Sequence, residues 1–176
     1  MLFACWNMAE EAEKSALEKI ALVLSAHGVE FVVVGGQAEL LMGSPRVTYD
    51  IDLCYKRSKE NLRRLAAALR EIKPTLRNAP ADLPFIIDEQ SLALGSNFTF
   101  DTTVGPLDFL GYLEPLGDFE AIADRAFSVR LSGCEVKVIH IDDLIAIKRH
   151  LGRPKDQQSL LQLLAIKKIQ AENSAE

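Results

Sequence analysis

The chain has 176 residues, of which 48% are hydrophobic and 26% charged, and its formal net charge is -5 at pH 7. This length and composition predict one soluble globular domain over residues 1–176, and the acidic balance excludes a constitutive binder of duplex DNA. Three widely spaced cysteines favour free thiols over a disulfide framework. No stretch is long enough to span a membrane, and the short apolar start lacks the basic segment of a signal peptide, so we expect a cytoplasmic protein.

Hydrophobic periodicity and turn residues predict alternating helices and strands. The expected order is helix 9–27, strand 31–34, helix 37–42, strand 47–55, helix 60–72, loop 74–84, a segment 85–113 that mixes a short helical turn with strands 97–103 and 107–113, helix 118–123, a hairpin of 127–131 and 135–139, and helices 141–151 and 155–170. This order predicts an α/β (α+β) fold, with a mixed twisted sheet flanked by helices. The core would cover about 15–140, and 141–170 would form a C-terminal helical segment.

Two acidic residues, Asp50 and Asp52, lie one residue apart within the strand-like run 47–55. On a strand they would point to the same face, where two like charges repel each other and need a compensating partner. A divalent cation such as Mg²⁺ is the expected partner, because hard cations prefer carboxylate oxygens. The alternative is a surface strand whose polar face lies in water.

Two further features predict a phosphate-transfer site beside this pair. Gly35 and Gly36 follow an apolar strand, so the backbone can approach a ligand and offer N–H groups to a phosphate; a tight turn alone is the alternative. Asp108 is a lone acid in an apolar run and is costly to bury unless it is paired or metal-bound; capping a turn is its alternative. Three carboxylates beside a glycine turn suit metal-dependent phosphoryl or nucleotidyl transfer.

The C-terminal helices add a lysine and an acid on apolar stripes. Lys148 and Asp156 could pair with each other or could both face a nucleotide. Otherwise Lys148 extends its charge to the helix edge and Asp156 is a first-turn acid favoured by the helix dipole. The segment 56–77, with eight Lys/Arg and two Glu, either guides a nucleic-acid acceptor or forms a solvated helix face.

The runs Gly35-Gly-Gln-Ala-Glu-Leu-Leu-Met and Arg46-Val-Thr-Tyr-Asp-Ile-Asp-Leu resemble the signature of the nucleotidyltransferase (DNA polymerase β-like) superfamily. That signature is a glycine turn and a short helix, followed by Asp-x-Asp on the next strand. The pattern is most similar to the minimal nucleotidyltransferases of the AbiEii type, the toxin side of type IV toxin–antitoxin systems. The run from Asp142 to Asp156 is similar to their Asp-Leu-x-x-x-Lys…Arg-x-x-Asp segment, so the resemblance covers about 15–170.

The resemblance implies a role for each matching residue. The catalytic carboxylates, which would also bind Mg²⁺ or Mn²⁺, are Asp50, Asp52 and Asp108. The positions expected to contact the nucleoside triphosphate or to lie beside it are Gly35, Gly36, Gln37, Thr48, Lys148 and Asp156, the last proposed as a base in the toxin group. Two positions differ from the family pattern: Gln37 stands where many members carry Ser or Thr, and Ser159 stands where a second Asp is expected.

These observations predict a Mg²⁺-dependent nucleotidyltransferase that moves NMP from an NTP to a hydroxyl on RNA, such as tRNA, or on a protein. A toxin–antitoxin role, with a cognate toxin or antitoxin protein as partner, is part of this hypothesis. The alternative is a catalytically degenerate module that binds nucleotide or serves as the partner half of such a pair. A metal-dependent phosphohydrolase is a third hypothesis.

Overall fold

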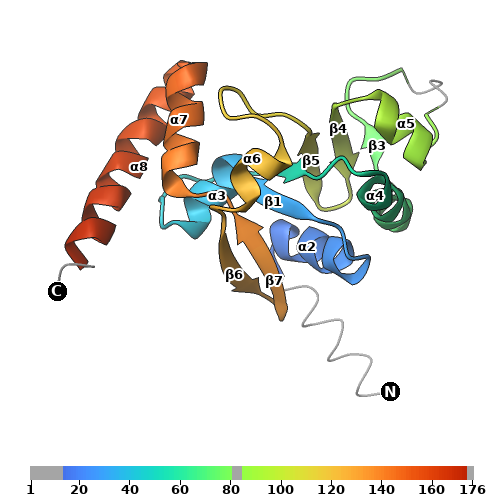
Figure 1. The fold of residues 1–176 in the computed structure, drawn as a ribbon, viewed down its shortest axis with the longest axis horizontal. Coiled ribbons are helices and arrows are strands. Elements are labelled where there is room, and N and C mark those ends of the chain that lie inside the picture. The colour runs from blue at the N-terminus through green and yellow to red at the C-terminus, as the bar shows by residue number, and fades with distance from the viewer. Residues whose placement is uncertain (1–13, 81–84, 174–176) are drawn as a thin grey trace.

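A mixed β-sheet forms the centre of the protein in the computed structural model, which describes residues 14–80 and 85–173 (Figure 1). The sheet in this part of the chain has seven strands in the order β3-β4-β5-β2-β1-β7-β6. The strands are β1 (Phe31–Val34), β2 (Ile51–Tyr55), β3 (Thr75–Leu76), β4 (Asn97–Thr102), β5 (Gly105–Leu110), β6 (Phe127–Leu131) and β7 (Cys134–Val138). Strand β2 is parallel to β5 and β1 is parallel to β7, whereas the other neighbours are antiparallel. The predicted mixed α/β sheet is thereby confirmed.

Helices begin where the sequence places capping residues. Ser15 and Glu18 form a capping box at the start of the first described helix, and the Ser58 side chain accepts a hydrogen bond from a backbone N–H in the next long one. Residues 9–13 of the first expected helix lie outside the described residues. The helices are α2 (Ala16–Ala26), α3 (Gly35–Leu41), α4 (Lys59–Ile72), α5 (Glu89–Leu94), α6 (Phe119–Ala123), α7 (Ile141–Leu151) and α8 (Pro154–Asn173).

Alternation along the central strands separates a packed face from a polar one. On β2, Leu53 and Tyr55 are fully buried, and Tyr55 packs edge-on against Phe109 of β5 with ring centroids 5.7 Å apart. Asp52 and Asp108 occupy the alternate positions of the same two strands, so they project from the opposite face. The hydrophobic core therefore holds the two strands in register and aligns their acidic residues.

Some boundaries differ from those expected. The strand predicted over 47–55 begins only at Ile51, and Val47 and Tyr49 are exposed. The reason is that this segment lies against α3, where Thr48 contacts Gly36 closely and its carbonyl oxygen accepts a 3.5 Å hydrogen bond from the Gln37 side chain. Strand β3 lies inside the predicted loop 74–84, of which residues 81–84 are not described.

Helices α7 and α8 pack against each other beside the sheet (Figure 1). Gly152 ends α7 in the left-handed conformation, with φ of 62°, and Pro154 begins α8 two residues later. This turn brings the start of α8 back towards the sheet. None of the helices in the described part of the chain has both the length and the apolar character that crossing a bilayer requires.

Candidate active site

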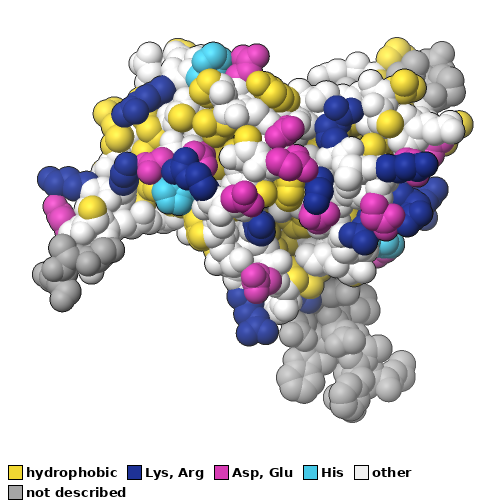
Figure 2. Space-filling view, viewed as in Figure 1, with side chains coloured by type: hydrophobic (Ala, Val, Ile, Leu, Met, Phe, Trp, Pro, Cys, Tyr) yellow, Lys and Arg dark blue, Asp and Glu magenta, His cyan; other side chains and the backbone are white. Residues whose placement is uncertain are grey.

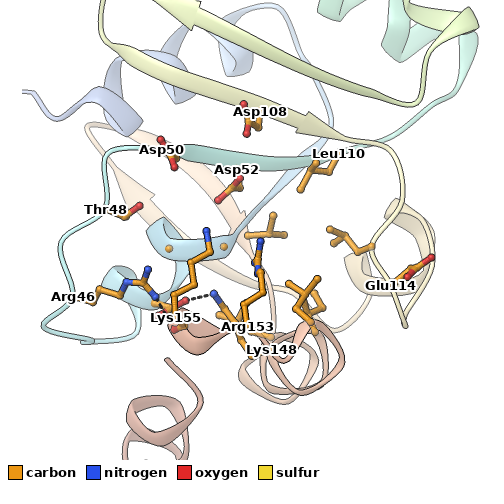
Figure 3. Close-up of a pocket in the computed structure, with 18 of the residues that line it drawn as sticks. Arg46, Thr48, Asp50, Asp52, Asp108, Leu110, Glu114, Lys148, Arg153 and Lys155 are labelled. Carbon is orange, nitrogen blue, oxygen red and sulfur yellow. Dashed lines mark hydrogen bonds and ion pairs between the residues drawn. The ribbon is translucent and has the colours of Figure 1, made fainter. Parts of the chain in front are cut away.

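Asp50, Asp52 and Asp108 lie together beside the two central parallel strands (Figure 3). Asp52 and Asp108 are register partners on β2 and β5, and Asp50 directly precedes β2. All three line a pocket of about 420 Å³, a volume in the range of small-molecule binding sites. The structure thus brings Asp108 beside the Asp50 and Asp52 pair, from which it is far apart in the sequence.

The glycine turn touches the same carboxylates. Gly35 has φ of 61°, and a Cβ atom at this position would overlap the Asp52 carboxylate. At Gly36 a Cβ would lie 2.8 Å from the Thr48 side chain. Only glycine therefore allows α3 to begin this close to Asp52 and Thr48. Gly35, Gly36 and Thr48 line the pocket, and Gln37 is held by its bond to the Thr48 carbonyl oxygen.

Three cationic side chains, Arg46, Arg153 and Lys155, line the pocket opposite the carboxylates; we call them the cationic rim. Arg46 donates hydrogen bonds to the Ser159 hydroxyl at 2.5 Å and to the Lys155 carbonyl oxygen at 3.3 Å. These bonds fasten the segment before β2 to the start of α8. Lys155 and Arg153 extend towards the acidic residues (Figure 3).

Sequence analysis gave the cationic rim no role. Arg46 and Arg153 lie within the runs that carry the family resemblance, and Pro154 marks the start of α8 between Arg153 and Lys155. The sequence does carry one signal for the rim, namely basic residues at a helix start that follows a Gly-x-Pro turn. Its position opposite Asp50 and Asp52 depends on how α7 and α8 pack, which the sequence pattern does not show.

Lys148 and Asp156 belong to a buried ionic network below the pocket. Lys148 Nζ lies 2.6 Å from Glu39 Oε1 and 3.6 Å from Asp156 Oδ1, and both carboxylates are fully buried. Arg153 donates two hydrogen bonds to Asp156, at 2.5 and 3.2 Å. Of the alternatives open for this pair, the ion pair is the one observed. Glu39 was missed by sequence analysis, although an acid among the apolar residues of a short helix was a signal.

Arg153 decides the ionisation of Asp156. Burial raises the pKa of the Asp156 carboxyl, but the hydrogen bonds and the charge of Arg153, with the charge of Lys148, lower that pKa below its ordinary value. Asp156 is therefore an ionised partner of two cations. Lys148 lines the pocket floor, whereas Asp156 lies behind it.

Asp108 has a cationic partner that the sequence did not suggest. Arg77 Nη2 lies 2.9 Å from Asp108 Oδ1, but this buried oxygen lacks an aligned hydrogen bond. The same guanidinium donates to Asp101 at 3.1 Å and to the Phe100 carbonyl oxygen at 2.8 Å. Burial raises the pKa of Asp108 more than the Arg77 charge lowers it.

Asp52 lies in the environment that most disfavours an ionised carboxylate. Burial, and then the charges of Asp108 and Asp50, raise its pKa to about 6, while Lys148 and Lys155 lower it only through longer-range attraction. A cation bound beside Asp52 would offset the charge of its ionised carboxylate. Carboxylate oxygens are also the donors that Mg²⁺ and Mn²⁺ prefer, so these three acids fit such an ion. Over residues 14–80 and 85–173, however, no three His, Cys, Asp or Glu side chains are arranged as a ready-made metal site. The metal-binding role of the three acids stays a prediction.

The basic segment 56–77 lies mostly away from this site. Lys and Arg side chains gather over α4 with Asp and Glu among them (Figure 2). Lys56 pairs with Glu30, and Arg63 and Arg64 pair with Glu60. No residue of α4 lines the pocket. These contacts favour the solvated-face interpretation for the helical part of the segment.

Solved structures described as nucleotidyltransferases or nucleotidyltransferase-like share this fold. A candidate nucleotidyltransferase from Thermotoga maritima is 18% identical, with a TM-score of 0.51 over 85% of this chain and 90% of that one. The lincosamide antibiotic adenylyltransferase LnuA, solved with lincomycin, is 15% identical, with a TM-score of 0.57 over 86% and 96%. An antigenic nucleotidyltransferase-like protein from Paracoccidioides brasiliensis is 14% identical, with a TM-score of 0.53 over 85% and 72%.

The structural likeness establishes the nucleotidyltransferase fold and confirms this part of the sequence-based expectation. No protein-family model matches the chain, and comparison with curated protein sequences finds no significant match. The AbiEii-type assignment stays a prediction, as do the roles of the individual site residues.

Proposed function

We propose that the protein is a nucleotidyltransferase that moves NMP from an NTP to an acceptor hydroxyl with the help of Mg²⁺ or Mn²⁺. The observation that carries the proposal is the arrangement of the pocket, in which Asp52 and Asp108, paired in register, lie opposite the cationic rim. A polyphosphate needs both chemistries, because its oxygens bind cationic side chains directly and bind carboxylates through a metal ion. The nucleotidyltransferase fold supports the proposal.

Asp50, Asp52 and Asp108 would hold the divalent cation. When bound, such an ion polarises phosphoryl oxygens and offsets the charge that develops during transfer. The raised pKa of Asp52 supports this assignment, because it reports a buried carboxylate without sufficient positive charge around it.

The triphosphate would lie between the glycine turn and the cationic rim. Gly35 and Gly36 let α3 begin close to Asp52 and Thr48, Thr48 offers a hydroxyl, and Lys155 and Arg153 offer positive charge. Lys148 reaches the nucleotide only from the floor, because its ammonium is held by Glu39 at 2.6 Å. Asp156 then acts through Arg153 and Lys148, whose positions it fixes.

In the transfer step, the acceptor hydroxyl oxygen bonds to the α-phosphorus while the bond from that phosphorus to the bridging oxygen of the β-phosphate breaks. Pyrophosphate leaves with the electron pair, and Asp108 accepts the hydroxyl proton. Lys155 and the other rim cations balance the charge of the departing pyrophosphate.

The acceptor proposed from the sequence is an RNA, such as tRNA, or a protein hydroxyl, within a cytoplasmic toxin–antitoxin system that includes a cognate partner protein. A further candidate acceptor class comes from the comparison with LnuA, which is described as a lincosamide antibiotic adenylyltransferase. These acceptors are distinguished by which molecule carries the label after incubation with an α-labelled NTP.

A catalytically degenerate nucleotide-binding module is the second candidate function. One observation favours it, namely that Arg77 already pairs with the carboxylate of Asp108, which would have to bind the metal ion. Two residue identities point the same way: Gln37 takes the usual place of Ser or Thr, and Ser159 binds Arg46 where a second Asp is expected.

Calorimetry with Mg²⁺ and each NTP tests the proposal. We expect at least one NTP to bind in a Mg²⁺-dependent manner, and Asp52→Asn to abolish that dependence. Asp124→Asn is the matched control, because Asp124 is exposed at the end of α6 and does not line the pocket. Absence of NTP binding to the wild type would refute both candidate functions, whereas binding without transfer to any acceptor would favour the degenerate module.

A further inference from the structure

The pocket has two ends of different chemistry. One end carries the glycine turn and the cationic rim. The other end, which we call the apolar wall, is formed by five side chains from β5, the loop after it and α7: Leu110, Leu113, Leu144, Ile147 and Leu151. The carboxylates of Asp52 and Asp108 lie between Thr48 and Leu110 (Figure 3).

If the proposed function holds, the geometry of transfer assigns the leaving pyrophosphate to one end of the pocket and the acceptor to the other. In an in-line displacement, the attacking oxygen and the leaving pyrophosphate lie on opposite sides of the α-phosphorus. Pyrophosphate is strongly anionic and belongs beside Lys155 and Arg153. The attacking hydroxyl must then arrive from the side of Asp108 and Leu110, so the apolar wall belongs to the acceptor.

We infer that the acceptor is a small hydroxyl-bearing molecule with an apolar body and no negative charge, bound against the apolar wall. Its oxygen bonds to the α-phosphorus, pyrophosphate leaves with the electron pair of the broken bond, and Asp108 takes the hydroxyl proton. Leu151 and Tyr112 line the pocket while 43% and 54% exposed, so they offer apolar surface that such a body would cover.

Charge at this end disfavours a nucleic-acid acceptor. Glu114 lies at this end beside Leu113, and the ammonium of Lys148 on the pocket floor is already paired with the buried Glu39 of α3. An RNA backbone would bring its phosphates beside Glu114 and the carboxylate of Asp108, which is repulsive. A nucleobase is disfavoured as well, because Leu and Ile side chains cannot pair with the polar edges that burial would desolvate.

Methyl NMR of the full chain, labelled at Leu and Ile, tests the inference with two probes of the same skeleton, phenylbutanol and phenylbutyrate. We expect the alcohol to shift wall methyls such as those of Ile147 and Leu113, and the carboxylate to bind much more weakly. Leu151→Gln should weaken alcohol binding about fivefold, since part of one leucine contact is lost. Leu161→Gln, an exposed position on α8 outside the pocket, should have no effect.

Three outcomes would overturn the inference. The first is equal binding of alcohol and carboxylate, and the second is a shift of the wall methyls by Mg²⁺-ATP alone, which would place the base there. The third is transfer of label from α-labelled ATP to total RNA while phenylbutanol leaves the wall unchanged; the acceptor assignment would then fail and the proposed function would stand. If no NTP binds at all, the proposed function fails first, and the acceptor role fails with it.

Discussion

Asp52 and Asp108 occupy directly opposed positions on two parallel neighbouring strands, and no residue of the sheet separates them. The pairing places two carboxylates side by side on a partly buried face, with Asp50 next to them. Burial raises the pKa of Asp52 most, the charges of Asp108 and Asp50 raise it further, and it reaches about 6. The proposed metal ion would therefore bind where the carboxylates repel one another and are partly removed from water.

Asp52 should make stability depend on pH between about 4 and 6. Its pKa in the folded state is raised above the ordinary 3.8, so the folded protein holds this proton more tightly than the unfolded chain does. The contribution to the free energy of unfolding is thus largest at low pH and is lost as the pH rises through about 6. At pH 7 without divalent cations, Asp52→Asn should be about 1–2 kcal/mol more stable than wild type in urea unfolding.

A cation should cancel that difference. With saturating Mg²⁺, we expect the wild type to gain stability and Asp52→Asn to gain little, because bound ligand stabilises the folded state. A wild type that is as stable as the variant at pH 7 in the absence of Mg²⁺ would show that Asp52 is not destabilised.

Replacement by alanine should destabilise the protein more at Gly35 than at Gly152, although both glycines have the same left-handed backbone conformation. Gly152 has φ of 62° and its Cβ would meet nothing closer than 3.9 Å, so Gly152→Ala should cost about 1 kcal/mol for the left-handed conformation alone. Gly35→Ala adds a clash with Asp52 and should cost about 2–4 kcal/mol. Urea unfolding of both variants measures the difference, and equal costs would mean that α3 can move away from Asp52.

The ion pair of Lys148 and Glu39 should show strong coupling. Lys148→Met leaves the fully buried Glu39 without its 2.6 Å partner and should cost about 3–5 kcal/mol. Combining it with Glu39→Gln should cost clearly less than the sum of the two single variants. Additive effects in this double-mutant cycle would indicate that the two charges do not interact.

Arg77 should compete with a metal ion for Asp108. Arg77→Met removes the guanidinium 2.9 Å from the Asp108 carboxylate, and we expect Mn²⁺ to bind several-fold more tightly in calorimetry, because a like charge is gone. Arg70→Met is the control, since Arg70 lies on α4 and does not line the pocket. Weaker Mn²⁺ binding to Arg77→Met would mean that Arg77 instead orients Asp108 for the ion.

Local sequence patterns were sufficient for most elements of the fold. The helix expected over 141–151 has those bounds, and the hairpin turns at Ser132 and Gly133, both with positive φ. Capping residues and apolar periodicity depend on neighbours in sequence, so they can be identified without tertiary information. The strand prediction was wrong for the segment 47–50, because the contact of this segment with Gly36 outweighs its strand-like pattern.

The carboxylates of the site could be predicted, but their partners could not. Asp50 and Asp52 stood out as two like charges on one face of a predicted strand, and Asp108 stood out as a lone acid in an apolar run. Arg77 and Glu39 contact residues 31 and 109 positions away, at Asp108 and Lys148, and only the packed sheet and the α7–α8 pair bring them together. Long-range ion pairs of this kind leave no periodic signal in a single sequence.

The most direct test of the central claim is transfer of label from α-labelled NTPs, with Mg²⁺, to total cell RNA, protein and small molecules. Wild type, Asp52→Asn and the control Asp124→Asn should be compared at equal concentration. We expect label on an acceptor with wild type and the control, and a loss of about a hundredfold or more with Asp52→Asn. Transfer that persists in Asp52→Asn at the wild-type rate would contradict the assignment of this pocket as the active site.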